Sequence, residues 1–333
     1  MANVTLAVLL GLTGRAGGQD LPDLVLHVPT LAQNAREELG SFKADACELQ
    51  PADLCVSGPG TRRLLRFSVL ALNRGTADVF LGTPSDADPR FVYSMCHEHY
   101  HFESFAKYEL RMRGETTVVA NGRKRSFCVE DTQPDPDFPQ PKTCTADADC
   151  NGHGRCVSGV CKYDCQYQGV QPGWGDLYPS DLPCQWIDVT DVPAGEYDLW
   201  VLLNTEQLLP ESDYANDTGM VPVTIGAEPD APVPSVKVRA KRKAKVGRDL
   251  KVAWKVRVKG GVDAVAVYDV WLSRDGGTTF PDLIVGGQLA ANRRVKWPVP
   301  ADAATEQAVV RVVAWTKALQ RGDGTSRRFR IVP

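Results

Sequence analysis

The stretch Cys96-His97-Glu98-His99-Tyr100-His101 holds three of the five histidines in a chain of 333 residues. In an extended strand, side chains alternate between the two faces, so His97, His99 and His101 are predicted to point the same way. Three converging imidazoles suit Cu(II) or Zn(II) better than calcium or magnesium, and nitrogen sites bind Cu(II) more tightly than Zn(II). The alternative is a polar strand whose histidines face water, but the strict alternation favours a metal site.

Length, charge and cysteine count limit the class of protein. A chain of 333 residues favours two domains. The net charge of −3 and the pI near 6.0 give no overall attraction to nucleic acid, so no nucleic-acid partner is expected. Ten cysteines, an even number, are typical of an oxidising compartment.

The N-terminus indicates export. Residues 5–12 form a short apolar run, and small residues at 16–18 provide a cleavage point, so residues 1–20 are predicted to be a signal peptide. The protein is then secreted, periplasmic or held at the cell surface. No stretch is long and apolar enough to predict a membrane span, and no pattern indicates an oligomeric state.

Residues 21–226 have the pattern of a mainly β domain, because short alternating stretches are separated by turns rich in Gly, Pro, Asp and Asn. Thr30–Leu39 is predicted to be a helix, and residues 131–183 a long loop held by covalent links. The predicted strands are Arg62–Asn73, Phe91–His101, Ala106–Arg113, Ser126–Glu130, Tyr197–Asn204 and Met220–Ile225.

Four cysteines lie close together at residues 144–161, in a run rich in Gly and Asp. This spacing predicts a small disulfide knot, and of the three possible pairings Cys144–Cys156 with Cys150–Cys161 is preferred. A zinc knuckle that includes His153 is the rival interpretation, although exported thiols usually oxidise first.

The end of the chain is predicted to be a second domain. Residues 227–235 form a Pro-rich linker. Residues 236–333 contain no cysteine and alternate regularly, which predicts a β-sandwich with a hairpin at Ser273–Phe280. This part resembles the immunoglobulin- or fibronectin-like modules appended to many bacterial secreted proteins.

A basic run extends from Lys237 to Lys259. We expect it to form a solvated strand face rather than a polyanion-binding patch. Aromatic residues of the kind that stack on nucleic-acid bases are sparse in it.

Three motifs together resemble the catalytic domain of the lysyl oxidases, copper amine oxidases that act on peptidyl lysine. They are Cys96–His101, Lys124-Arg-Ser-Phe-Cys-Val-Glu-Asp-Thr132 and Cys184-Gln-Trp-Ile-Asp-Val-Thr-Asp191. The resemblance runs from about Leu21 to Ile225. It implies a β-sandwich core with long disulfide-linked loops, and copper bound by His97, His99 and His101.

The resemblance also implies an organic cofactor, lysine tyrosylquinone, made from two side chains of the protein itself. The matching residues are Lys124 and Tyr178, and Asp176 matches a family aspartate that would act as the catalytic base. Composition alone favours a solvated turn lysine, a half-buried loop tyrosine and a plain loop carboxylate at these positions. The implied reaction converts a primary amine, either a protein lysine or a small amine, to an aldehyde, and O₂ yields hydrogen peroxide alongside ammonia.

A calcium site is implied by strings near both ends of the first domain. The oxygen ligands would come from Asp23, Leu24, Glu211, Asp213, Asn216 and Asp217. Carboxylate, amide and carbonyl oxygens are the ligands that calcium takes. An ordinary Asx-rich turn is the alternative, and Asp217 stands where the family has asparagine.

The chain departs from the animal enzymes at two positions. Trp174 replaces a cysteine that would bond near Cys184, and Lys107 replaces a histidine just past the copper motif. The pairings expected for the remaining cysteines are Cys47–Cys55, Cys96–Cys165 and Cys128–Cys184.

Two other function classes remain open at this point. One is a secreted zinc hydrolase, in which the three histidines hold a zinc ion that activates water. The other is a non-catalytic secreted adhesion protein, because a cysteine knot and a C-terminal sandwich also fit that class.

Overall fold

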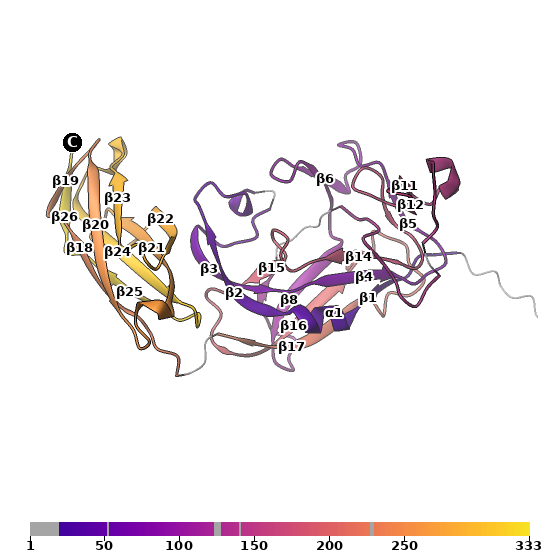
Figure 1. The fold of residues 1–333 in the computed structure, drawn as a ribbon, viewed down its shortest axis with the longest axis horizontal. Helices are drawn as coiled ribbons and strands as arrows, with labels where there is room; N and C mark the ends of the chain where they lie inside the picture. Colours follow the sequence, from indigo (N-terminus) through magenta and orange to yellow (C-terminus); the bar gives the residue numbers. More distant parts are fainter. Residues whose placement is uncertain (1–19, 52, 123–127, 140, 227–229) are drawn as a thin grey trace, which may run out of the picture.

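The computed structural model describes residues 20–51, 53–122, 128–139, 141–226 and 230–333 (Figure 1). The predicted signal peptide, apart from Asp20, and Lys124 lie outside these residues. Strands account for 48% of the chain and helices for 6%, which confirms the mainly β prediction. Among the described residues, no helix is both long enough and apolar enough to cross a membrane.

Residues 20–226, which we call the N-terminal module, fold around one main hydrophobic core of buried apolar side chains that includes Leu24, Phe67 and Leu199. Two four-stranded sheets and one three-stranded sheet enclose this core. In spatial order they are β1 (Leu24–Leu26), β4 (Val69–Asn73), β14 (Trp174–Tyr178) and β10 (Gln133–Pro134); β17 (Thr218–Ile225), β16 (Gly195–Leu203), β8 (Ala106–Met112) and β9 (Val118–Asn121); and β15 (Trp186–Asp188), β3 (Gly60–Arg66) and β2 (Arg36–Phe42).

Three two-stranded sheets lie in the connections of the N-terminal module. Its helical elements are α1 (Val28–Asn34) and 3-10 helices at Cys47–Leu49 and Asp147–Cys150. The hairpins and pairs are β6 (Phe91–Ser94) with β7 (His99–Phe102), β13 (Gln168–Val170) with β5 (Val79–Gly82), and β11 (Arg155–Val157) with β12 (Val160–Lys162).

Several predicted elements have different bounds. The helix expected at Thr30–Leu39 ends at Asn34, because the chain then pairs with β3 as strand β2. The strand expected at Arg62–Asn73 is two strands, β3 and β4. A strand was expected at Ser126–Glu130, but the described residues of this range, 128–130, do not form a strand.

Five disulfides close the N-terminal module, and no described cysteine is free. The knot has the predicted pairing, Cys144–Cys156 and Cys150–Cys161. These two bridges leave no thiolate to hold a zinc ion, so the zinc-knuckle interpretation is wrong, and His153 instead contacts Asp78, with 2.9 Å between its Nδ1 and Oδ2. The other three predicted pairings are also wrong, because the pairs that meet in space are Cys47–Cys96, Cys55–Cys184 and Cys128–Cys165.

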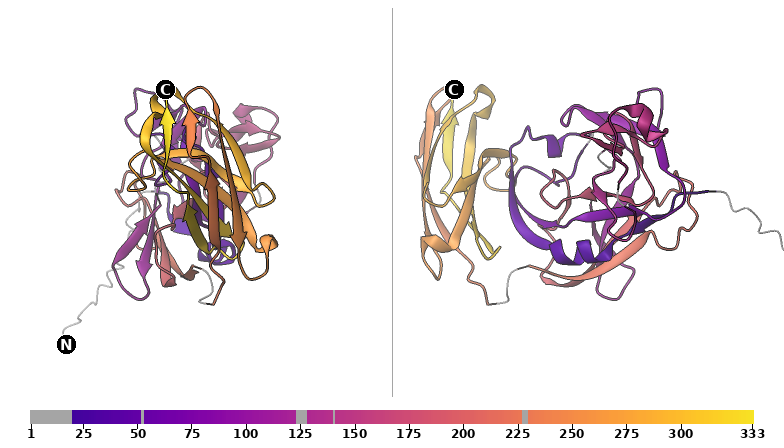
Figure 2. Two further views of the ribbon diagram at one scale, coloured as in Figure 1. Left: turned by 90° about the vertical axis from the view of Figure 1, so that its left-hand side faces the viewer. Right: turned by 45° about the vertical axis from the view of Figure 1, so that its right-hand side comes forward.

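Residues 235–333, which we call the C-terminal module, form two sheets around a second core that includes Trp254, Tyr268 and Val312. The module lies beside the N-terminal module in Figures 1 and 2. One sheet has the order β18 (Ser235–Ala240), β20 (Asp249–Arg257), β23 (Arg294–Pro298). The other has the order β19 (Lys243–Lys245), β26 (Phe329–Val332), β24 (Thr305–Thr316), β21 (Val265–Ser273), β22 (Asp282–Leu289), with β25 (Arg321–Thr325) paired to β24 and 3-10 helices at Val262–Ala264 and Ala301–Ala303.

One buried carboxylate joins the two modules. Asp269 of β21 accepts hydrogen bonds from the Thr61 backbone N–H at 3.0 Å and from the Thr61 hydroxyl at 2.7 Å. It also accepts from the Gly287 N–H and the Trp315 indole. The side chain of Asp269 is only 2% exposed, so its charge is compensated by these four donors rather than by water.

Candidate metal and cofactor site

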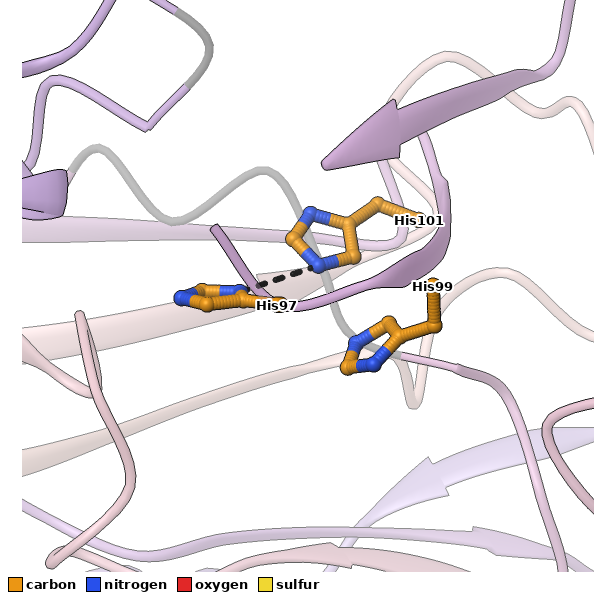
Figure 3. A group of neighbouring side chains, drawn as sticks. All are labelled: His97, His99 and His101. Atoms are coloured by element: carbon orange, nitrogen blue, oxygen red, sulfur yellow. Dashed lines mark hydrogen bonds between the residues drawn. The ribbon is translucent and has the colours of Figure 1, made fainter. Parts of the chain in front are cut away.

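The three histidines of the central motif lie on the hairpin of β6 and β7 (Figure 3). His99 and His101 alternate in β7, as predicted, but His97 lies in the turn between the strands. The prediction of one continuous strand from Phe91 to His101 is therefore wrong. Glu98 has a positive φ of 58°, and this turn of the backbone brings His97 back toward the two strand histidines.

The histidine nitrogens are close enough to share one ion. One ring nitrogen from each of the three lies within 4.8 Å of the others, and His97 Nδ1 is 3.2 Å from His101 Nε2. His101 is buried and the other two are half-buried. Bonds from imidazole to such a metal are about 2.0 Å long, so this donor set fits a single Cu(II) or Zn(II) ion.

Burial favours the metal-binding form of one of these rings. It lowers the pKa of His99, and the neighbouring His97 lowers it further. The Nε2 atom of His99 is shielded from solvent. A neutral imidazole is the form that ligates a metal, so the ring does not first have to lose a proton.

A cavity of about 380 Å³ brings the histidine site and the predicted cofactor residues together. His97 and His99 form part of its wall, and Asp176 and Tyr178 form another part. Residues about 80 positions apart in the sequence therefore face one space.

Tyr178 and Asp176 lie in strand β14, which pairs with β4 inside the sheet. The prediction of a loop at these positions is wrong. The Tyr178 hydroxyl donates to Asp176 Oδ2 at 2.5 Å and also approaches the Cys128 carbonyl at 3.3 Å. Burial, followed by the Asp176 carboxylate, raises the pKa of Tyr178 well above its usual value, so its phenol is protonated in the metal-free protein.

Lys124 lies outside the described residues, but the chain is described again from Cys128, four positions later. Cys128 lines the same cavity as Tyr178 and is tied to Cys165 by a disulfide.

Two acidic residues near the site were not singled out from the sequence. Glu130 lines the cavity, and burial raises its pKa. Its position inside the motif Lys124–Thr132 could have identified it from the sequence. Asp53 is 8% exposed, and the charges of His97 and His99 oppose the rise in pKa that burial causes. Nothing in the sequence pointed to Asp53, because it is distant from the histidines in the sequence; the Cys47–Cys96 disulfide ties its loop to the histidine hairpin.

Trp174 and Lys107, the two positions at which the sequence departs from the family it resembles, lie on strands of the core sheets. Trp174 is buried in β14, opposite Pro134. Lys107 is exposed on β8 and pairs with Glu109 at 2.7 Å between Nζ and Oε1. With Asp53 and others, Lys107 lines a separate cavity of about 530 Å³.

The residues of the predicted calcium site come together from both ends of the N-terminal module. The Glu211 carboxylate accepts from the Leu24 N–H at 2.6 Å, and the Asn216 amide donates to Asp23 at 3.2 Å. Burial, followed by the nearby Glu211, raises the pKa of Asp217 to about 8.

Two oxygen atoms of this group have no hydrogen-bond partner among the described residues: Asn216 Oδ1 and Asp217 Oδ1, both shielded from solvent. Such buried oxygens cost free energy unless something compensates them. A hard cation such as calcium takes ligands of this kind, so the group fits one.

Comparison with known proteins agrees with this geometry. The family model described as "Lysyl oxidase" matches residues 28–226. The chain belongs to the lysyl oxidase family. It is 34% identical over 211 residues to lysyl oxidase homolog 2 of Mus musculus, covering 61% of this chain and 24% of that protein. It is 40% identical over 157 residues to protein-lysine 6-oxidase of Sus scrofa, covering 47% of this chain and 54% of that protein.

The family model matches only residues of the N-terminal module. This lysyl oxidase family member spans about a quarter of the length of the homolog 2 relatives, and the family model ends at residue 226. The matched region includes the histidine hairpin, β14 and all five disulfides.

Proposed function

We propose that this protein is a copper- and quinone-dependent amine oxidase that converts primary amines to aldehydes with release of ammonia and hydrogen peroxide. The observation that carries the proposal is the cavity of about 380 Å³ whose wall includes His97, His99, Asp176 and Tyr178. A metal site and an oxidisable phenol that share a cavity are the two parts that this chemistry needs.

His97, His99 and His101 would hold the copper. When bound, copper together with O₂ supplies the oxidising power that turns the Tyr178 phenol into a quinone. The protein's contribution is to fix the ring, which the hydrogen bonds to Asp176 and the Cys128 carbonyl do.

Lys124 is the proposed second precursor of the cofactor. It precedes Cys128 by four positions in the sequence, and the Cys128 carbonyl contacts the Tyr178 hydroxyl.

Asp176 is the proposed base. Its carboxylate is 1% exposed and lies 2.5 Å from the Tyr178 oxygen, next to the place where substrate would be held by the cofactor. A base must lie within hydrogen-bond reach of the proton that it removes, and the position of Asp176 beside the Tyr178 oxygen meets that condition. Asp176 would take the proton from the substrate carbon next to the amine.

The substrate is proposed to be a protein lysine or a small primary amine, with O₂ as the oxidant. The name of the Sus scrofa relative, protein-lysine 6-oxidase, supports a lysine side chain as the substrate.

Five disulfides support an oxidising location, in line with secretion. The two sets of sheets support separate domains at 21–226 and 236–333. Calcium is proposed at the Asp23, Leu24, Glu211, Asp213, Asn216 and Asp217 group.

The test is amine-dependent peroxide production by the copper-reconstituted protein. We expect Tyr178→Phe to abolish turnover while it still binds copper, and Tyr268→Phe, another buried tyrosine in the C-terminal core, to keep it. Turnover by Tyr178→Phe would overturn the proposal. Amine-independent hydrolysis by the zinc-loaded protein would favour a hydrolase instead, and copper binding without any peroxide would favour an adhesion protein.

A further inference from the structure

The net charge of −3 conceals a strong asymmetry between the two modules. Residues 236–333 carry 21 of the 38 Lys and Arg residues but only 8 of the 41 Asp and Glu residues, a net charge of +13. Residues 1–235 therefore carry −16. Such a division between halves of a chain indicates that the basic part meets an anionic partner.

The sheet of β18, β20 and β23 concentrates this positive charge on one face. Its strands alternate strictly, with Val236, Val238, Val252 and Trp254 buried in the core and charged side chains pointing outward. We call the outward set the basic face, and it consists of Lys237, Arg239, Lys251, Lys255, Arg257, Arg294 and Lys296. All seven are exposed.

The charges of the basic face are not compensated. None of the seven forms an ion pair or a side-chain hydrogen bond with another described residue, and Asp249 is the only acidic residue on the three strands. Lys237 lies directly opposite Lys255, and Lys251 directly opposite Lys296. Like charges in directly opposed positions destabilise a sheet, so an anion bound between these cations would relieve that repulsion.

The basic face also has a defined shape. Ala253 is the strand partner of Arg239 on one side and of Arg294 on the other. The small side chain leaves a groove of about 570 Å³ that the two arginines flank, and Lys251 and Lys296 also line it. Arginine guanidinium groups bind sulfate, phosphate and carboxylate through paired hydrogen bonds.

The basic face lies on the far side of the C-terminal module from the N-terminal module. The contacts between modules involve Asp269 and Trp271, which point outward from the other sheet. The core lies between the two sheets, so a ligand on the basic face would not meet the N-terminal module of the same molecule.

We propose that the basic face binds an acidic polysaccharide. Alternate side chains on a strand are about 6.6 Å apart and neighbouring strands about 4.8 Å apart, so the face matches a linear polymer with repeated anionic groups better than a single small anion. The exposed large apolar side chains of the described residues all lie outside β18, β20 and β23. The face therefore lacks platforms for nucleic-acid bases and apolar groups for membrane insertion.

Five disulfides also argue for a location where acidic polysaccharides, rather than nucleic acids, are the common polyanions. Binding there would hold the N-terminal module close to its substrates while leaving its cavity open.

The experiment uses the full chain and heparin, a sulfated polysaccharide, as the probe. The variant Arg239→Gln/Lys251→Gln/Arg294→Gln removes three cations of the basic face. The control, Lys317→Gln/Arg327→Gln/Arg328→Gln, removes the same residue types from exposed positions outside it. At low salt we expect the first variant to lose at least about tenfold in heparin affinity, with a shallower salt dependence, and the control to lose less than about threefold.

Four results would overturn the proposal. The first two are that the wild type does not bind heparin, or that both variants lose the same heparin affinity. The other two are that the basic face binds duplex DNA or anionic vesicles more tightly than heparin, or that it causes self-association in sedimentation. The last would mean that the acidic N-terminal module of a second copy covers the face. Unchanged peroxide production by the face variant would show that it is folded, and would keep this test separate from that of the amine oxidase activity.

Discussion

Asp53 shows how one residue outside the predicted motifs can bear on the metal site. Its Oδ2 atom is buried and has no hydrogen-bond partner among the described residues. It lies within electrostatic reach of His97 and His99. A carboxylate beside histidine ligands orients the rings and compensates the charge of a bound cation.

We therefore predict that Asp53→Asn weakens Cu(II) binding by about tenfold, within the range found for residues that support metal ligands. Competition titration against a chelator of known affinity measures it. Glu48→Gln, a half-buried acid on the same loop, is the control and should change the affinity little. Equal affinities for Asp53→Asn and the wild type would contradict this role.

Asp217 leads to a pH-dependent prediction. Its pKa rises from the usual value near 3.8 to about 8 in the folded, calcium-free protein, because it is buried beside Glu211. A carboxyl with a raised pKa holds its proton more tightly when folded, so the free energy of unfolding falls as the pH rises from about 4 to about 8.

Denaturant unfolding in EGTA should accordingly show lower stability at pH 8 than at pH 5, and Asp217→Asn should reduce that difference. Calcium should restore stability at pH 8 in the wild type more than in the variant. Calcium without effect on the wild type at either pH would rule out the proposed site.

At the level of elements, the Cys47–Cys96 disulfide is the link that most directly shapes the histidine hairpin. Cys96 immediately precedes His97, and the bridge spans 49 residues. Replacing both cysteines by serine should lower the free energy of unfolding by about 2–4 kcal/mol.

The same double replacement should also weaken copper binding, because the turn that carries His97 loses its covalent anchor. Removing Cys144–Cys156 is the matched control, since that bridge lies in the knot and not in the hairpin. A copper affinity that falls equally in both variants would mean that the loss is one of general stability.

Local patterns predicted much of this architecture but not the contacts between distant segments. Alternation located β3, β4, β6, β7, β8, β16 and β17 of the N-terminal module but missed β1, β2, β5 and β9 to β15. The spacing of Cys144, Cys150, Cys156 and Cys161 gave the right knot. The other cysteines are far apart in the sequence, so spacing does not decide which of them meet.

The position of Tyr178 illustrates the same limit. Residues 174–178 form a strand that packs closely on β4, and an added Cβ at Gly175 would lie 2.7 Å from side-chain atoms of Leu70 and Leu72. No local pattern reports that approach. Likewise, the helix at residues 28–34 is cut short by pairing with β3, a partner that lies more than 20 residues away.

At the scale of the whole molecule, the two modules are held together through Asp269. We predict that Asp269→Ala lowers the free energy of unfolding by about 1–3 kcal/mol, because the donors of Thr61, Gly287 and Trp315 lose a charged acceptor. Limited proteolysis in the linker at 227–235 should become faster. The exposed Asp263→Ala is the control, and equal proteolysis of both variants would argue against a joint that depends on Asp269.

The central claim is that the N-terminal module makes its own cofactor from Lys124 and Tyr178 beside a copper ion. The most direct measurement is peptide mass spectrometry of the copper-reconstituted protein after exposure to O₂. We predict a cross-linked species that joins the Lys124 and Tyr178 peptides, absent without copper and absent in Tyr178→Phe. Recovery of both peptides unmodified from protein that oxidises amines would contradict the account.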